Sequence, residues 1–199
     1  TADLNPSSDG TVVVNGPADV AEDAAGNGNA AATPFSINYD GTRPRVTIYM
    51  TFDRDPYNLK ILIVNVSFNE EVIGFNENDF NITNGEIISF YSVEDGKNFQ
   101  VTFTLETDGP VTVAIPENVV TDHADNMNQA SNIISFEYDS TRPSVTINQS
   151  TTQPDPTNSQ PINFIATFSE PIVPYSFVAG DLTFEGITET PTITVTEIS

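Results

Sequence analysis

Apolar and polar residues alternate along most of the chain, in short runs separated by turn-forming residues about every ten positions. Residues 61–68 are the clearest case, with Leu62, Val64, Val66 and Phe68 on one face of the run. A period of two residues is typical of a strand with one buried face, and no stretch shows a convincing helical period. The pattern predicts seven strands in the middle of the chain, near residues 46–48, 61–68, 80–82, 87–93, 98–105, 111–115 and 134–138.

Turn signals support the same assignment. Residues 94–97 (Glu-Asp-Gly-Lys) predict a hairpin between two of the strands, and a long loop spans residues 116–130. Seven short strands in about 100 residues without helices predict an all-β fold, an antiparallel β-sandwich of immunoglobulin-like type. Further along, the alternation returns, and we expect an inner face there that consists of Ile162, Phe164, Ala166 and Phe168.

The chain repeats itself at a spacing of 99 residues. Comparison of residues 9–48 with residues 108–147 needs no gap and finds 20 identities in 40 positions. The linker at residues 39–44, Tyr-Asp-Gly-Thr-Arg-Pro, returns at residues 138–143 with a single change. Self-similarity of this length indicates tandem repeats. We expect the C-terminal part of one repeat in residues 1–38, a complete repeat in residues 39–138, and the N-terminal part of a third in residues 139–199.

A short linker that contains proline favours an extended connection and a semi-rigid row of domains. The chain starts at Thr1 without a signal peptide, as expected for a processed chain or a piece of a longer one. Half of a sandwich would leave an open sheet edge and an uncovered core. We therefore expect the chain to continue beyond both ends. The alternative is that the C-terminal half of one copy completes the N-terminal half of the next by head-to-tail contact.

Composition excludes several classes of function. Of the 199 residues, 28 are Asp or Glu and 6 are Lys or Arg, which gives a net charge of −22. So few cations argue against partners such as nucleic acids and anionic membrane surfaces. The absence of cysteine removes thiol chemistry, disulfides and thiolate metal sites. No apolar run approaches the roughly 18 residues of a membrane span, so we expect no direct insertion into a membrane.

Several motifs resemble bacterial-type Ig-like repeats, which form the shafts of large adhesins and other surface proteins. They are residues 23–27 (Asp-Ala-Ala-Gly-Asn), the linker at 39–44, residues 155–158 (Asp-Pro-Thr-Asn) and residues 168–172 (Phe-Ser-Glu-Pro-Ile). The resemblance implies a non-enzymatic protein at the cell surface or outside the cell. The middle repeat departs from the pattern, because His123, Asp125 and Met127 replace small residues and Asn-Glu-Glu replaces Ser-Glu-Pro at residues 69–71.

Calcium is the leading ligand hypothesis, because Ca²⁺ takes six to eight oxygens from carboxylates, amides and carbonyls. If the strands run alternately up and down, the loops after the second, fourth and sixth strands lie at the N-terminal end of the domain. Carboxylates that converge at a junction repel one another unless a cation binds there. At the N-terminal end we expect Asp40, Glu70, Glu71, Asp122 and Asp125. At the opposite end we expect Asp53, Asp55 and Asp108 near Asp139, facing Glu170 of the next repeat.

The alternative is that these Asp and Asn residues build turns through bonds from side chain to backbone. It applies above all to Asp23 and Asp122, whose repetition a loop-organising role explains equally well. For Arg43 and Arg142, which repeat among few cations, the alternatives are an ion pair with the junction carboxylates and a solvated linker residue.

Other chemistry has weak support. The single histidine, His123, has no serine or cysteine nucleophile at a defined spacing, so we expect no catalytic residues and no enzyme. Three sequons make Asn65, Asn81 and Asn148 candidates for glycosylation in a eukaryotic secretory pathway. The main functional hypothesis is a rod or stalk in which neighbouring repeats are the partners and a terminal domain binds a ligand. The alternatives are a subunit of an extracellular filament or flagellar hair, and a module whose loops bind carbohydrate or protein.

Overall fold

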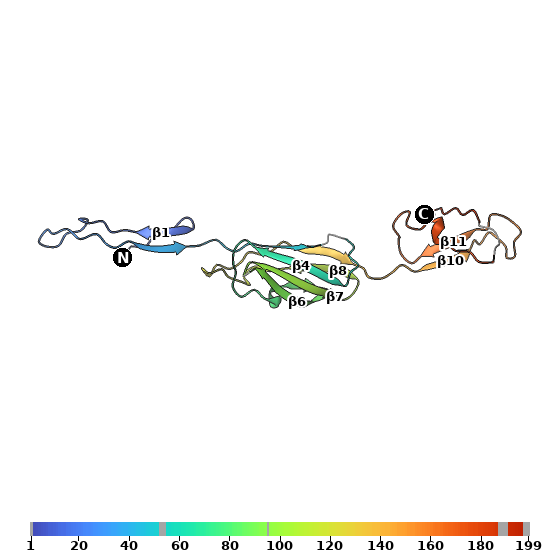
Figure 1. Ribbon diagram of the computed structural model, residues 1–199, viewed down its shortest axis with the longest axis horizontal. Coiled ribbons are helices and arrows are strands. Elements are labelled where there is room, and N and C mark those ends of the chain that lie inside the picture. Colours follow the sequence, from blue (N-terminus) through green and yellow to red (C-terminus); the bar gives the residue numbers. More distant parts are fainter. Residues whose placement is uncertain (1, 52–54, 95, 187–190, 197–199) are drawn as a thin grey trace. The chain divides into compact units, whose positions relative to one another are not determined.

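The computed structural model describes residues 2–51, 55–94, 96–186 and 191–196. It divides into two compact units, one that ends at Ser140 and one that begins at Thr141, and each is described by itself. The first unit contains strands β1 (Gly10–Val14), β2 (Phe35–Tyr39), β3 (Val46–Met50), β4 (Ile61–Phe68), β5 (Asn81–Thr83), β6 (Gly85–Glu94), β7 (Asn98–Leu105), β8 (Gly109–Ala114) and β9 (Ile134–Tyr138), with the 3₁₀ turn η1 (Glu77–Asp79) (Figure 1). The second contains β10 (Val145–Gln149), β11 (Phe164–Phe168) and the 3₁₀ turn η2 (Ala179–Asp181).

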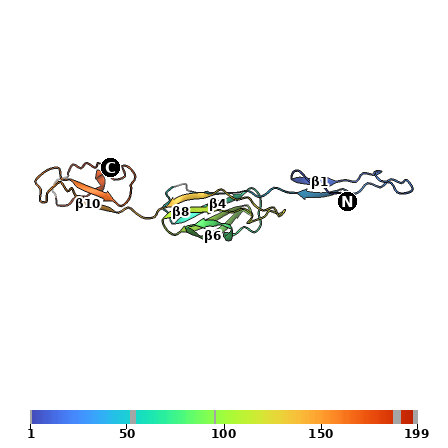
Figure 2. The ribbon, with the colours of Figure 1, turned by 180° about the vertical axis from the view of Figure 1, so that it is seen from behind.

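Strands β3 to β9 form an antiparallel β-sandwich, seen from both sides in Figures 1 and 2. One sheet has the order β3-β4-β7-β6 and the other has the order β5-β8-β9. This architecture confirms the fold class predicted from the sequence, and β4 and β7 have the predicted bounds. The β6–β7 turn includes Gly96 at φ 64°, a conformation that glycine adopts without strain.

The core lies between the two sheets and consists of the residues that alternate inward. Along β4, the side chains of Leu62, Val64, Val66 and Phe68 are buried, as the alternation predicts. The ring of Phe68 packs edge-on against Phe75, with ring centroids 5.1 Å apart. Burial of this apolar surface is the main stabilising contribution to the sandwich.

Two further antiparallel pairs lie outside the sandwich. The pair β1–β2 has Val12 opposite Ile37, and the pair β10–β11 has Ile147 opposite Ala166. Side chains on their apolar faces are largely exposed, because each pair lacks an opposing sheet among the described residues. Of the expected inner face of the last repeat, Phe164, Ala166 and Phe168 lie on β11, whereas Ile162 precedes the first residue of the strand.

Helical structure in the described residues is limited to the two 3₁₀ turns, each three residues long. None of these residues forms a helix with the length and apolar character needed to cross a membrane.

Candidate functional site

Three carboxylates from separate segments converge at one end of the sandwich. Asp40 follows β2, Glu70 follows β4, and Asp122 lies in the loop between β8 and β9. One oxygen from each lies within 4.8 Å of the other two. Asp40 is exposed, Glu70 is half-buried and Asp122 is buried. The structure therefore brings together three of the five residues that the sequence places at this end.

The local electrostatics differ between the members of this cluster. Burial raises the pKa of Glu70, and the negative charges of Asp122, Asp40 and Asp9 raise it further. Burial alone would raise the pKa of Asp122, but hydrogen bonds from the Asn126 side chain and from the backbone N–H groups of Asn126 and Ala124 outweigh it and lower the pKa below its usual value. Burial and the neighbouring negative charges thus destabilise the ionised form of Glu70, whereas hydrogen bonds stabilise the ionised form of Asp122.

The chemistry of this cluster suits a hard cation. Oxygens that share one Ca²⁺ ion lie about 2.3–2.6 Å from it, so two of them can be no more than about 5 Å apart. The separations of at most 4.8 Å between the three carboxylates satisfy that limit. A bound divalent cation would also offset the repulsion that raises the pKa of Glu70.

Asp9, at the start of the β1–β2 hairpin, connects that hairpin to the linker. Its carboxylate accepts hydrogen bonds from the Thr42 hydroxyl and from the Gly41 N–H, the latter at 2.7 Å. These two bonds lower the pKa of Asp9. The arrangement recurs 99 residues later, where Asp108 accepts from the Ser140 N–H at 2.7 Å and from the Ser140 hydroxyl at 2.8 Å.

The other expected ligands at the N-terminal end have different neighbours. The carboxylate of Glu71 lies 3.5 Å from Nε2 of His123, and both side chains are exposed. Asp125 is exposed in the left-handed region at φ 66°, and its N–H donates to the Asp122 carbonyl. His123 makes no hydrogen bond to a hydroxyl group among the described residues.

The expected ligands at the opposite end are not found as a cluster within the described residues. The Asp55 carboxylate accepts a hydrogen bond from the Glu137 N–H at 3.0 Å. The Asp139 N–H donates to the Tyr57 carbonyl. Asp53 lies outside the described residues, and Glu170 belongs to the second unit. A calcium site at this end stays a prediction.

The loop of the cluster is organised by a repeated hydrogen-bond network. Oδ1 of Asp122 accepts from the N–H groups of Ala124 and Asn126, and Oδ2 accepts from the Asn126 side chain. Asp23 and Asn27 form the same bonds in the earlier repeat. Asp122 thus has the turn-building role that the sequence left open, and three of its roughly four lone-pair sites are used.

Asn128, which repeats Asn29 in the sequence, is the hydrogen-bonding centre of this loop. Its side chain is fully buried, donates to the carbonyls of Pro116 and Gln129, and accepts from the N–H groups of Val119 and Val120. The equivalent Asn29 forms the same four bonds in its own loop. The sequence signal is the repetition of this asparagine two positions after Asn27 and Asn126.

Arg43 fixes the linker to the same loop. Its guanidinium donates to the carbonyls of Met127 and Asn128 at 2.7 and 2.6 Å, and to Oδ1 of Asn118 at 2.7 Å. The Glu117 carboxylate lies 3.4 Å away. Arg43 therefore binds mainly the carbonyls of this loop and also pairs with Glu117, while its side chain stays partly exposed.

We expect the Arg43→Ala variant to lower the free energy of unfolding by about 1–2 kcal/mol, because three loop acceptors lose a charged donor. Cleavage of the linker by a nonspecific protease should become faster as well. Urea unfolding and limited proteolysis check both effects. Arg45→Ala is the matched control, because the Arg45 side chain is exposed; an equal loss in both variants would contradict this role of Arg43.

The three sequons lie on strands. Asn81 and Asn148 are exposed. Asn65 is half-buried, donates to the Thr51 hydroxyl at 3.2 Å and accepts from the Gln100 side chain at 3.2 Å. Glycosylation at these positions stays a prediction.

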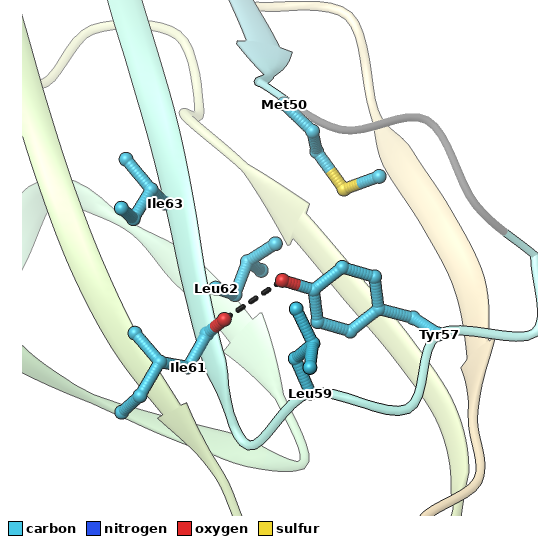
Figure 3. Close-up of a pocket in the computed structure, with 6 residues that line it drawn as sticks. All are labelled: Met50, Tyr57, Leu59, Ile61, Leu62 and Ile63. Atoms are coloured by element: carbon cyan, nitrogen blue, oxygen red, sulfur yellow. Dashed lines mark hydrogen bonds between the residues drawn. The ribbon is translucent and has the colours of Figure 1, made fainter.

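A pocket of about 140 Å³ with an almost entirely apolar lining lies at the start of β4. Figure 3 shows the six residues that line it. The hydroxyl of Tyr57 donates to the Ile61 carbonyl at 2.7 Å, so its polar atom is already paired. The lining residues carry no charged group: Met50, Tyr57, Leu59, Ile61, Leu62 and Ile63.

Comparisons with known proteins agree with the fold. The family model described as a bacterial Ig-like domain matches residues 40–138. This range contains the seven strands of the sandwich, the linker residue Asp40 and the loop that Asn128 organises. No curated protein and no solved structure matches the chain. Residues 40–138 of this chain are a bacterial Ig-like domain of the kind that the repeat motifs indicate.

Proposed function

We propose that the chain is a non-enzymatic structural segment, a rod or stalk of tandem Ig-like repeats in a large extracellular adhesin or cell-surface protein. Calcium at the junction between repeats stiffens it. Bacterial Ig-like domains are typically found outside the cell or at its surface, which supports this location. The partners are then the neighbouring repeats, and the ligand of the whole protein is bound elsewhere.

The observation that carries the proposal is the double attachment of the linker. On one side, Asp9 of the preceding hairpin binds Gly41 and Thr42. On the other side, Arg43 binds the loop between β8 and β9, and the Gln129 N–H donates to the Pro44 carbonyl at 2.8 Å. A linker that is bonded to both neighbours restricts their relative motion, which is what a stalk requires.

The calcium component is supported by the carboxylate cluster at this same linker. Asp40 belongs to the linker itself, while Glu70 and Asp122 belong to loops of the sandwich. A cation held by all three would cross-link the linker to the domain. Its positive charge would stabilise the ionised form of Glu70, which burial and neighbouring carboxylates destabilise. Binding of the cation would therefore stabilise the folded domain.

We expect Ca²⁺ to raise the melting temperature of the sandwich relative to chelator. At a free concentration 100 times the dissociation constant, a single site adds about 2.7 kcal/mol to the free energy of unfolding. For a domain of this size, that corresponds to roughly 10 °C or more. Thermal unfolding followed by circular dichroism, with excess Ca²⁺ or with chelator, checks the shift.

The Glu70→Gln variant tests whether a calcium-dependent rise in melting temperature comes from a cation bound at this cluster or from general screening of the negative charge of the chain. This variant should lose most of the calcium-dependent shift and should melt higher than the native chain in chelator, because the opposed charge is gone. Glu86→Gln removes an equal charge from an exposed position on β6 and should keep the full shift. Identical melting of the native chain with calcium and with chelator would refute the calcium site.

A filament subunit is the second candidate function. It would use the same series of Ig-like repeats with bonded linkers as the stalk.

A further inference from the structure

One outer face of the sandwich carries two exposed tyrosines with amide side chains between them. In the sheet β3-β4-β7-β6, four residues that lie opposite one another on adjacent strands form one row across the sheet: Tyr49, Asn65, Gln100 and Tyr91. The row faces away from the core, because the next residues along the two central strands, Val64 and Val101, are fully buried. We call this set of four residues the tyrosine–amide row.

The row is open to solvent over its whole length. The side chains of Tyr49 and Tyr91 are 53% and 64% exposed. They lie on the two edge strands of the sheet, three strand spacings and thus about 14 Å apart. Between them, the Gln100 side chain donates to Oδ1 of Asn65 at 3.2 Å. This bond orients the two amides, while the side-chain carbonyl oxygen of Gln100 accepts no bond among the described residues and is available to a ligand.

The same face is almost uncharged, although the chain has a net charge of −22. Among the described side chains that the four strands place on this face, only Glu86 carries a charge at neutral pH. Glu86 lies opposite Thr104, away from the row. Ser67 and Thr102, which flank the row on β4 and β7, add hydroxyl groups to the face. The surface around the row is therefore polar and neutral.

The internal repeat indicates that the fold does not require the row. At the equivalent place in β10–β11, Asn148 and Ile165 replace the opposed pair of Tyr49 and Asn65. The inward-facing valine and phenylalanine at one end of the same strand pair are kept in the later repeat. Core residues are thus repeated while the row is not. The other outer face of the sandwich differs as well, because β5, β8 and β9 place no aromatic side chain on it.

We propose that the tyrosine–amide row binds a neutral polysaccharide, which lies across the strands from Tyr49 to Tyr91. The C–H faces of sugar rings are apolar and stack on aromatic rings, and neighbouring hydroxyl groups pair with the donor and acceptor atoms of an amide. The distance between the tyrosines suits a stretch of a few sugar rings. This binding goes beyond the proposed stalk, since it would attach the side of the stalk to polysaccharide around it.

The charge and the layout of the face favour this ligand over two others. An anionic polymer would be repelled by the acidic chain and would find no cation on the row. Protein interfaces place aromatic side chains at a buried centre inside a polar rim. The row has the reverse order, with amides at the centre and tyrosines at the two edges of the sheet.

Affinity electrophoresis in native gels tests the inference. The 199-residue chain is produced in a host that does not glycosylate the Asn65 sequon, and chelator is present throughout. The gels contain hydroxyethyl cellulose, galactomannan or glycogen as neutral polysaccharides, and alginate as the anionic comparison. We expect at least one of the neutral polymers to retard the native chain and alginate to leave its migration unchanged.

Variants of the row locate the binding. Tyr49→Ala and Tyr91→Ala should each raise the dissociation constant for the retarding polymer about tenfold or more, because each removes a stacking ring. Tyr91→Phe keeps the ring and should retain most of the affinity. Tyr175→Ala is the matched control, since Tyr175 is 91% exposed but belongs to the second unit. Thermal melting of each variant shows that the sandwich is still folded.

A native chain whose migration is unchanged by all three neutral polymers would overturn the inference. An equal loss of retardation in Tyr175→Ala would overturn it too, because it would indicate nonspecific adsorption of exposed rings. Sedimentation velocity without polysaccharide covers the protein alternative: a native chain that self-associates while Tyr91→Ala stays monomeric would assign the row to a protein contact instead. Because these measurements are made in chelator, their failure is separate from failure of the calcium-dependent melting shift.

Discussion

Replacing Asn128 by Ala should lower the free energy of unfolding of the sandwich by about 3–4 kcal/mol. The substitution removes the Oδ1 acceptor that the Val119 and Val120 N–H groups share and the Nδ2 group that donates to the Pro116 and Gln129 carbonyls. Each buried polar group left without a partner costs about 1–3 kcal/mol, although water admitted to the loop recovers part of this. Native domains are stable by only about 5–15 kcal/mol, so the loss is a large fraction of the total.

Urea unfolding followed by far-UV circular dichroism measures this effect. Asn29→Ala is an unusually close control, because Asn29 makes the same four bonds but is only half-buried, in an exposed loop that water can reach. We expect a change of no more than about 1 kcal/mol there. Equal effects in the two variants would mean that burial does not decide the role of this asparagine.

Phe68→Ala should lower the free energy of unfolding by about 3–5 kcal/mol, the range for removal of a buried aromatic ring. The Phe68 ring is almost completely buried between the sheets and packs edge-on against Phe75 and Phe99. Its removal loses the burial of the ring and leaves a cavity that the rigid strands β4 and β7 cannot close.

The midpoint of urea unfolding should shift without a change in the slope, since the unfolded chain exposes a similar surface. Tyr91→Ala is the matched control, because this aromatic ring projects from β6 into solvent. Surface substitutions usually change stability by less than about 0.5 kcal/mol. A loss above about 2 kcal/mol for Tyr91, or below about 1 kcal/mol for Phe68, would contradict the assigned core.

The strands could be predicted because their signal is local. Along β4 and β7 the two-residue alternation of apolar side chains depends only on which face is buried, and both strands have the predicted bounds. At Ile162 the apolar alternation extends beyond the residues of β11 that pair with β10. Pairing, rather than alternation, decides where a strand begins.

The site was only partly predictable, because carboxylates from different loops meet through the tertiary fold. Alternation of strand direction predicted one end for Asp40, Glu70 and Asp122, and these three do converge there. The same argument predicted Glu71 and Asp125 at that site, but Glu71 lies beside His123 and Asp125 occupies a left-handed turn position. Side-chain direction within a loop depends on its hydrogen bonds, which spacing alone does not specify.

By itself, the sequence determined the all-β class, the 99-residue repeat and the strongly acidic character of the chain, since each is a property of residue order and composition. Only the tertiary structure decided that Asn128 is the centre of the β8–β9 loop and that Arg43 binds chiefly the backbone carbonyls of this loop. The physical reason is the same in both cases. Backbone carbonyl and N–H groups carry no signature in the sequence, and folding alone determines which of them a polar side chain must satisfy.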